Sequence, residues 1–263
     1  GYGSLIVAYS GGVDSTLLAK VAYDVLKDNA LALTAISPSY SAADREDAIR
    51  FALSIGIRHE FVNTDEIENE AYTANNSNRC YFCKEELFTK IEEYKKTSVG
   101  FAHVAYGPVT DDLGDFRPGM RAAKQAGAKA PLIDAGLSKD DVRVLSRNLG
   151  LESWNKPAAP CLSSRIAYGE QVTKEKLSQI EEAEIYIRLE GFKEFRVRHH
   201  GDVARIEIPP SAFQALFVDG RAQRLVTNIK SVGYKYVAVD LEGFRSGSLN
   251  EVLEEEKKRQ TTN

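Results

Sequence analysis

The residues best suited to chemistry form a Ser- and Gly-rich run, YSGGVDST over residues 9–16, which follows the apolar segment Leu5–Ala8. An apolar strand, a tight glycine turn and a helix-like segment together direct backbone N–H groups and the positive end of a helix toward one anion. The glycines can adopt positive φ and leave room for phosphate oxygens, and the serine hydroxyls add donors. An aspartate is out of place in such a cradle unless a divalent cation such as Mg²⁺ lies between it and the phosphates. The run therefore predicts a nucleotide phosphate site made by Ser10, Gly11, Gly12, Asp14 and Ser15, with Asp14 as the Mg²⁺ ligand.

The kind of nucleotide chemistry follows from what this run contains and what it lacks. It lacks the Gly-Lys-Ser/Thr ending of a Walker A loop, which argues against a kinase or GTPase that acts on the γ-phosphate. It resembles, residue for residue, the SGGxDS signature of the PP-loop ATP pyrophosphatases. That resemblance implies attack on the α-phosphate of ATP with release of pyrophosphate. The competing interpretation is a Ser/Gly turn that only caps a helix.

Three cysteines form the second group, with Cys80 and Cys83 three residues apart, directly before a predicted helix, and Cys161 in a Pro-rich segment. A zinc site would need a histidine as fourth ligand, and a Cys80–Cys83 redox pair would leave Cys161 without a role. A 4Fe–4S cluster held by three thiolates would use all of them and leave one iron open to a non-protein ligand. Buried, inert cysteines are the remaining alternative. The neighbouring phosphate loop favours the cluster, because an adenylated carbon needs a nucleophile and an open iron can present sulfide.

Arginines form the third group. Arg196 and Arg198 alternate along a predicted strand, so they share one face and could hold a phosphate together. The alternative is a solvated strand face that pairs with Glu207. Weaker candidates are arginines in Gly/Pro/Ser-rich loops and aspartates that could hold Mg²⁺ or cap turns: Arg117, Arg165, Arg245, Asp111, Asp112 and Asp115.

The elements that must position these residues follow from hydrophobic periodicity. In the first 150 residues, apolar segments predict strands at 5–9, 31–36, 59–62 and 102–106, and amphipathic segments predict helices at 15–26, 42–53, 84–94 and 139–149. Alternating strands and helices predict an α/β fold, a parallel sheet with helices on both faces. Ligands of such sheets bind beyond the carboxyl ends of the strands, where Ser37 and Gly107 would shape an adenosine pocket.

The second half of the chain predicts a smaller α+β domain. A long helix at 173–189, capped by Thr173, precedes strands at 195–199 and 204–208 joined by a turn at 200–202, then a helix at 221–232 and a strand at 236–240. Residues 108–137 are expected to be irregular, with a short helix near 120–125. We expect a nucleotide domain over 1–155, a crossing segment over 156–170 that carries Cys161, the small domain over 171–250 and a charged tail over 251–263.

Composition sets outer limits on function. The chain has 263 residues, 43% of them hydrophobic, and a net charge of −4. No apolar run approaches a bilayer span and no signal peptide is visible, so a cytoplasmic location is expected. Three cysteines are too few for a secreted disulfide framework, and the negative charge disfavours a large nucleic-acid footprint.

Taken together, these motifs resemble the LarE family over nearly the whole chain. The matching segments are SGGVDS, RCYFCK, GPVTDDLGDFRPG, WNKPAAPCLSSR, EEAE, FRVRHHGDVARIEIP and GFRSG. The resemblance implies a PP-loop (adenine nucleotide alpha hydrolase-like) fold and an ATP-dependent sulfur transferase that makes the nickel-pincer nucleotide cofactor of lactate racemase. ATP would adenylate a carboxylate of pyridinium-3,5-biscarboxylic acid mononucleotide, and sulfur would replace AMP to give a thiocarboxylate. It further implies that Ser10–Ser15 bind ATP phosphates, that Arg196 and Arg198 bind the substrate phosphate, supported by Glu184 and Arg245, and that the protein forms a homo-oligomer, a hexamer.

The resemblance leaves the sulfur source open between two family strategies. One branch sacrifices the sulfur of a single cysteine, at the position of Cys161 here, whereas the presence of Cys80 and Cys83 matches the branch that holds a 4Fe–4S cluster. The sulfide donor is not identified by sequence. A PP-loop tRNA thiolase is the alternative enzyme, and a nucleotide-sensing or metal-storage protein the non-catalytic one.

Overall fold

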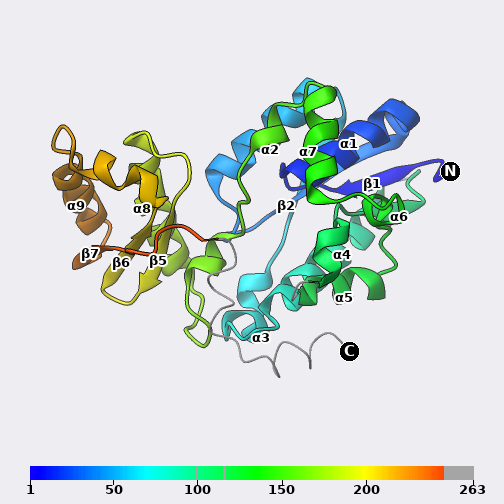
Figure 1. Ribbon diagram of the computed structural model, residues 1–263. Helices are drawn as coiled ribbons and strands as arrows, with labels where there is room; N and C mark the ends of the chain where they lie inside the picture. The colour runs from blue at the N-terminus through cyan, green and yellow to red at the C-terminus, as the bar shows by residue number, and fades with distance from the viewer. Residues whose placement is uncertain (99, 115–116, 246–263) are drawn as a thin grey trace. The chain divides into compact units, whose positions relative to one another are not determined.

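The computed structural model describes residues 1–98, 100–114 and 117–245 and divides them into two compact units (Figure 1). Unit 1 contains residues 1–72 and 78–159, and unit 2 contains residues 73–77 and 160–245. The short segment 73–77 thus belongs with the second half of the chain, although its neighbours on both sides belong to the first. Each unit is described by itself below.

Unit 1 is built on a four-stranded parallel sheet in the order β3-β2-β1-β4. Its strands are β1 (Leu5–Ala8), β2 (Ala30–Ile36), β3 (Arg58–Asn63) and β4 (His103–Ala105). The central strand β1 is flanked on both sides, with Leu5 opposite Ala30 of β2 and His103 of β4. This confirms the predicted α/β class.

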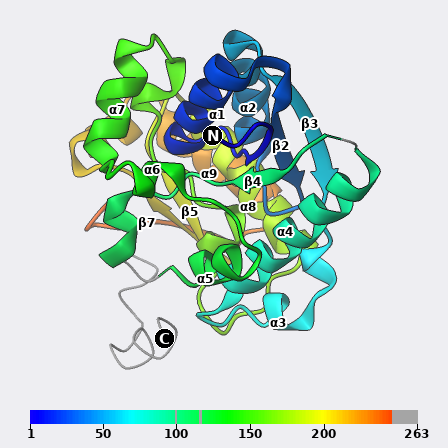
Figure 2. The same ribbon diagram turned by 90° about the vertical axis from the view of Figure 1, so that its right-hand side faces the viewer.

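Helices cover both faces of this sheet (Figure 2). Leu5 and Val7 of β1 pack with α1 (Val13–Leu26), α2 (Ala42–Ile55) and α7 (Lys139–Asn148) on one face. Ile6 points to the other face, toward α4 (Arg79–Thr97) and α5 (Pro118–Gln125). Alternate side chains of a strand point to opposite faces, so an uninterrupted apolar run such as 5–8 is what a doubly covered strand requires.

Short elements complete unit 1. They are the helices α3 (Glu70–Thr73), whose last residue belongs to unit 2, and α6 (Pro131–Asp134), and the 3₁₀ segments η1 (Lys27–Asn29), η2 (Glu66–Glu68), η3 (Thr110–Gly114) and η4 (Glu152–Asn155). Among the described residues, no helix combines the length and the apolar character that crossing a membrane would demand.

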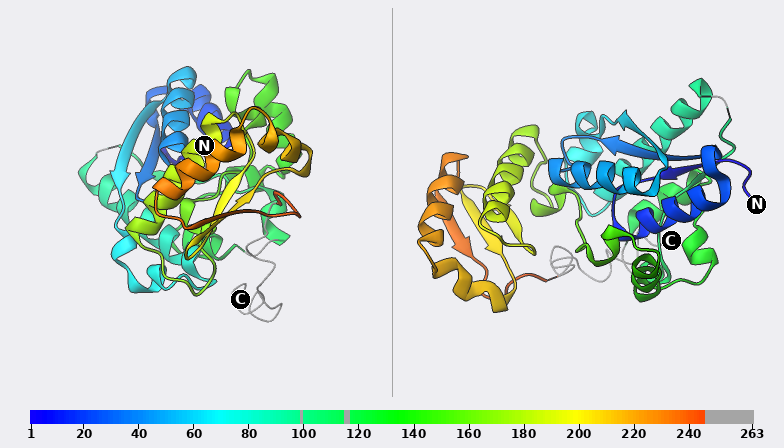
Figure 3. Two further views of the ribbon diagram at one scale, coloured as in Figure 1. Left: turned by 90° about the vertical axis from the view of Figure 1, so that its left-hand side faces the viewer. Right: turned by 90° about the horizontal axis from the view of Figure 1, so that it is seen from above.

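Unit 2 is an α+β unit, as the sequence predicts (Figure 3). Strands β5 (Arg196–His200) and β6 (Val203–Glu207) pair antiparallel, and β7 (Tyr236–Val239) pairs parallel to β6. One face of this sheet, including Val197, Ala204 and Ile206, packs against α8 (Lys174–Leu189) and α9 (Arg221–Ser231). Thr173 caps α8 by accepting a hydrogen bond from the backbone of Lys176, at 3.3 Å. The 3₁₀ segments η5 (Leu162–Arg165) and η6 (Pro210–Phe217) lie in the same unit.

Three local expectations need correction. Helix α4 begins at Arg79, so Cys80 and Cys83 lie in its first turn and not before it. Residues 108–137 are less irregular than expected, because η3, α5 and α6 form within them. The strand β5 is buried on both faces, so the alternative of a solvated arginine face is wrong. The predicted tail at 251–263 lies outside the described residues.

Candidate functional site

The loop between β1 and α1 has the shape of an anion cradle. Gly11 has φ +69° and a Cβ there would lie 2.8 Å from Cα of Ala48 on α2, so only glycine fits. Gly12 instead has φ −77° and is the N-cap of α1, so the expectation of positive φ holds for one glycine of the two. Because Gly12 has no side chain to cap the helix, the first-turn N–H groups of α1 can face a ligand.

Two serine hydroxyls order this loop from within. Oγ of Ser15 donates to the carbonyl of Gly12 at 3.1 Å and lies 3.2 Å from Oγ of Ser10. The N–H of Ser10 in turn donates to Oγ of Ser15 at 3.3 Å. The hydroxyls therefore hold the loop's own backbone, and they are close enough to the first turn of α1 to contact a bound phosphate.

Asp14 forms an ion pair that the sequence did not reveal. Nζ of Lys139 donates to both carboxylate oxygens of Asp14, at 2.7 and 2.5 Å. Lys139 is the first residue of α7, and its backbone N–H donates to Oδ2 of Asp111 at 2.9 Å. One sequence signal could have pointed to it, since a lysine is unfavourable at the positive end of a helix unless another group stabilises it.

The ends of neighbouring strands enclose the loop. Gly107, just after β4, approaches the start of α1 so closely that a Cβ would lie 3.1 Å from C of Asp14 and N of Ser15. The hydroxyl of Tyr40 lies 3.0 Å from the carbonyl of Ser10 and 3.0 Å from that of Asp44, and burial beside Asp44 raises the pKa of Tyr40. Tyr40 is a second residue that sequence reasoning missed, because nothing in its local pattern indicates a contact with residue 10.

Ser37 lies after β2, at the same edge of the sheet, and begins a polar chain. Its Oγ is 2.9 Å from Oγ of Ser39, which donates to Oε1 of Glu66 at 3.1 Å. Glu66 is 3% exposed, and its Oε2 is buried without a hydrogen-bond partner. This edge therefore offers both hydroxyl and carboxylate groups beside the phosphate loop.

The remaining candidate residues of unit 1 form hydrogen bonds and ion pairs with other groups of the protein. Asp112 accepts from the backbone of Val109 at 2.9 Å and pairs with Arg117 at 2.8 Å. His59 lies 2.8 Å from Oγ1 of Thr34, and burial lowers its pKa to about 4. Asp115 lies outside the described residues.

Cys80 and Cys83 lie one helical turn apart at the start of α4, Cys80 exposed and Cys83 partly exposed. Helix α5 packs closely against the first turn of α4, because a Cβ on Gly119 would lie 3.1 Å from the carbonyl oxygen of Cys80. Cys161 is partly exposed and belongs to unit 2. None of the three forms a disulfide, and among the residues that the structure describes no three His, Cys, Asp or Glu side chains are grouped closely enough to hold a metal ion.

Unit 2 buries a cluster of three arginines and two glutamates: Arg165, Arg196, Arg198, Glu184 and Glu207. Nε of Arg198 donates to Oε1 of Glu207 at 2.9 Å, so the predicted pairing of these two exists, but in the interior. Arg165 forms a bidentate pair with Glu184, at 2.9 and 3.2 Å. The cluster carries one positive charge in excess.

The excess charge falls on Arg196. Its guanidinium donates to the carbonyl of Arg245 at 3.1 Å and lies 4.5 Å from the ring centroid of Phe244. Burial, together with the positive charges of Arg198 and Arg165, lowers the pKa of Arg196 to about 10. A desolvated guanidinium that contacts a carbonyl and an aromatic ring is suited to bind an anion. Arg245 itself pairs with Glu242 at 2.8 Å.

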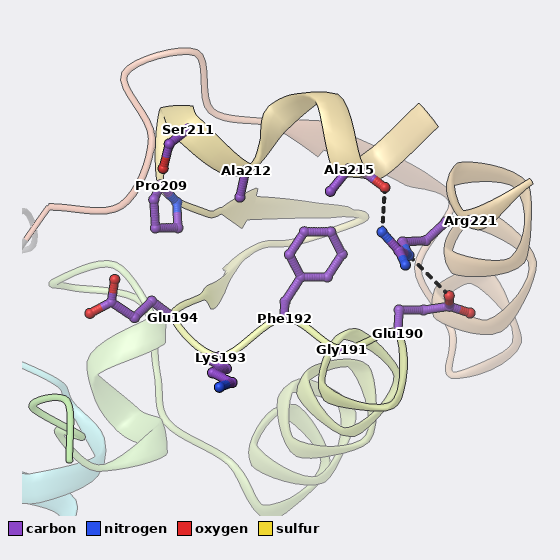
Figure 4. Close-up of a pocket in the computed structure, with 10 residues that line it drawn as sticks. All are labelled: Glu190, Gly191, Phe192, Lys193, Glu194, Pro209, Ser211, Ala212, Ala215 and Arg221. Atoms are coloured by element: carbon purple, nitrogen blue, oxygen red, sulfur yellow. Dashed lines mark hydrogen bonds and ion pairs between the residues drawn. The ribbon is translucent and has the colours of Figure 1, made fainter. Parts of the chain in front are cut away.

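A cavity of unit 2 lies away from the predicted site residues (Figure 4). It measures about 350 Å³ and is lined by Phe192, Lys193, Pro209 and Arg221, among others. Arg221 donates to the carbonyl of Ala215 and pairs with Glu190 at 3.4 Å across one end of it. None of the predicted site residues is among those that line this cavity.

Comparison with known proteins gives matches along nearly the whole chain. A family model described as NAD synthase matches residues 1–93. The chain is 50% identical over 248 residues to an uncharacterized protein of Synechocystis sp., covering 94% of this chain and 92% of that protein. It is 37% identical over 248 residues to the pyridinium-3,5-bisthiocarboxylic acid mononucleotide synthase of Lactiplantibacillus plantarum, covering 94% and 89%. An uncharacterized protein of Methanocaldococcus jannaschii is 28% identical over 242 residues, covering 92% and 91%.

Proposed function

This chain belongs to the LarE family of PP-loop proteins, and from that premise we propose that it is an ATP-dependent sulfurtransferase. Its substrate would be pyridinium-3,5-biscarboxylic acid mononucleotide, and its product the bisthiocarboxylic acid. The observation that carries this proposal is the identity of 37%, over 94% of the chain, to the synthase of Lactiplantibacillus plantarum. We place the activity in the cytoplasm and in a homo-oligomer, a hexamer by family resemblance.

The first half-reaction would take place at the loop between β1 and α1. A substrate carboxylate oxygen attacks the α-phosphorus of ATP, the bond to the bridging oxygen breaks, and pyrophosphate leaves with that oxygen's electron pair. The N–H groups at the start of α1 and the hydroxyls of Ser10 and Ser15 would hold the phosphates. Asp14 would hold Mg²⁺, since its oxygens can accept more than the ammonium of Lys139. Ser37 and Gly107 would border the adenosine.

The substrate's own phosphate would bind at the buried arginines of unit 2. Arg196 supports this assignment because it is desolvated and carries the excess charge of the cluster. Arg198 would share the phosphate, although it also pairs with Glu207 at 2.9 Å. Glu184 and Arg245 would support the pocket by fixing the elements around it.

The second half-reaction would replace AMP with sulfur at the activated acyl carbon. Cys80, Cys83 and Cys161 would hold a 4Fe–4S cluster, which when bound supplies a sulfide on its open iron. Two features support this assignment. All three thiols are outside disulfides, and Cys80 and Cys83 lie one helical turn apart with at least partial exposure. The alternative is that Cys161 gives up its own sulfur and becomes dehydroalanine.

Anaerobic reconstitution with iron and sulfide tests this proposal. We expect visible absorbance and bound iron, pyrophosphate release only when substrate and Mg²⁺·ATP are both present, and loss of thiocarboxylate formation in Cys80→Ala, Cys83→Ala and Cys161→Ala. If only Cys161→Ala is inactive, the sacrificial route replaces the cluster. Salt-sensitive tRNA binding with tRNA-dependent pyrophosphate release would instead identify a tRNA thiolase.

A further inference from the structure

One buried guanidinium holds the backbone of the loop that carries Cys161. Nη1 of Arg165 donates to the carbonyls of Pro160 and Cys161, the latter at 3.2 Å, and to Oγ of Ser164 at 3.0 Å. The carbonyl of Cys161 also accepts from the N–H of Ser164 at 2.9 Å, which starts η5. The cysteine backbone is therefore fixed from two sides.

The opposite edge of the same guanidinium is anchored in the unit's core. Nε and Nη2 of Arg165 bind the two carboxylate oxygens of Glu184 on α8, and both side chains are less than a tenth exposed. Oε1 of Glu184 also accepts from the backbone N–H of Val197 on β5 at 3.1 Å. A bidentate pair fixes orientation as well as distance, so the loop is tied to both α8 and β5.

Other buried side chains hold the carbonyls that follow. Nη1 of Arg198 donates to the carbonyl of Ser164 at 2.6 Å. Nδ2 of Asn75 donates to the carbonyls of Ile166 and Ala167, at 3.3 and 2.7 Å. Leu162 and Ile166 are buried, whereas Cys161 stays partly exposed. The loop thus presents one accessible thiol from a backbone that is held on both sides of it.

We propose that Arg165 is a positioning residue that fixes the Cys161 thiol for sulfur transfer, with Glu184 as its anchor. The inference rests on the proposed function in one respect, namely that Cys161 takes part in sulfur delivery. It holds for either sulfur source, because a metal ligand and a sulfur donor both lose efficiency when the thiol is displaced by about 1 Å. It also gives Arg165 a role other than contact with a ligand.

The test measures the thiol itself, without ATP, substrate or metal. In the reduced full-length protein, alkylation by iodoacetamide is followed for each cysteine by mass spectrometry, with Cys80 and Cys83 as internal references. Arg165→Lys keeps the positive charge but loses the bidentate guanidinium. In this variant we expect Cys161 to be alkylated about tenfold faster than in the unaltered protein, with the rates at Cys80 and Cys83 unchanged. Glu184→Gln keeps the shape of the anchor and should give a smaller increase. Arg224→Lys is the matched control, since Arg224 forms an exposed bidentate pair with Glu190 in the same unit.

Hydrogen exchange of the unaltered protein provides a readout that does not depend on a variant folding. The amides of residues 161–166 should exchange much more slowly than those of the exposed turn at residues 201–202. Equal exchange in these two segments, or Cys161 alkylation in Arg165→Lys equal to that in Arg224→Lys, would overturn the proposal. Neither result bears on whether the protein transfers sulfur, which the cysteine variants test separately.

Discussion

Arg196 and Arg198 lie two residues apart on β5 and are equally buried, yet their partners differ. Arg198 pairs with the fully buried Glu207, whereas Arg196 donates to the carbonyl of Arg245. Removing one partner of a buried ion pair leaves the other charge uncompensated, but removing a desolvated charge whose hydrogen-bond acceptor is a neutral carbonyl does not. The two arginines therefore serve stability in different ways, although the sequence pattern makes them look equivalent.

Replacing each arginine by methionine should distinguish the roles of Arg196 and Arg198. We expect Arg198→Met to lower the free energy of unfolding by about 3 kcal/mol, since Arg205 retains only part of the contact with Glu207. Arg196→Met should leave it unchanged or raise it by about 1 kcal/mol, while abolishing binding of the mononucleotide phosphate. Urea unfolding followed by circular dichroism measures the first quantity and calorimetric titration the second. Equal losses of stability in both variants would contradict this assignment.

The ammonium of Lys139 pairs with Asp14 and therefore affects the charge of the phosphate loop. Lys139→Gln removes the positive charge beside Asp14, so the phosphate loop attracts the triphosphate less strongly. We expect kcat/KM for ATP in pyrophosphate release to fall about tenfold. Lys20→Gln is the control, because Lys20 forms a comparable pair with Asp24 on the same helix α1. If both variants behave alike, the pair at Asp14 has no role in nucleotide use.

At the residue scale, the sequence located candidate functional residues better than it identified the residues they contact. The run at 10–15 and its glycine turn follow from local pattern, because the positive φ of residue 11 favours glycine before any contact with α2 is considered. Lys139 and Tyr40 were missed because each contact joins segments that only the folded sheet brings together, 125 and 30 residues apart. The sequence predicted the pairing of Arg198 with Glu207 but on a solvated strand face, whereas the pair is buried. Periodicity does not show what covers the second face of a strand.

At the scale of elements, hydrophobic periodicity predicted every described strand of both sheets to within one residue at each end. The predicted start of α4 was wrong for two reasons. Arg79, Cys80 and Tyr81 do not continue the apolar periodicity of the helix, and Asn78 at the N-cap makes no side-chain hydrogen bond that would mark the start. The close approach of the end of β4 to the start of α1 could not be predicted, since it depends on the distance between two elements.

The close contact between Gly107 and the start of α1 can be tested by substitution. Alanine there would place Cβ 3.1 Å from the backbone of Asp14 and Ser15, so either β4 or the phosphate loop must shift. We expect Gly107→Ala to weaken ATP binding about tenfold, consistent with the usual cost of overpacking. Gly114→Ala is the matched control, because nothing lies within 4 Å of a Cβ at that position. Isothermal titration with ATP compares them, and equal affinities would show that the loop tolerates the displacement.

At the scale of the whole molecule, the division of the chain is not a simple sequence of two halves. Residues 73–77 leave unit 1 to complete unit 2, where Asn75 is fully buried with φ +54°. Its Nδ2 also donates to the carbonyl of Glu170 at 2.9 Å, so one amide holds three carbonyls of the segment around residues 166–170. Composition indicates a crossing near residue 160 but gives no sign of this earlier insertion.

Asn75 should therefore control the stability of unit 2 from within the first half of the sequence. Asn75→Asp replaces the donor amide with a carboxylate oxygen that faces three carbonyls. We expect the free energy of unfolding of unit 2 to fall by about 3 kcal/mol. Asn75→Gly relieves the backbone at positive φ and loses only the hydrogen bonds, so its loss should be smaller. Hydrogen exchange by mass spectrometry distinguishes the units, because residues 161–170 should exchange faster in both variants while β1 and β2 stay protected. Faster exchange in β1 and β2 to the same extent would mean that the two units unfold together and that the insertion at 73–77 has no separate effect.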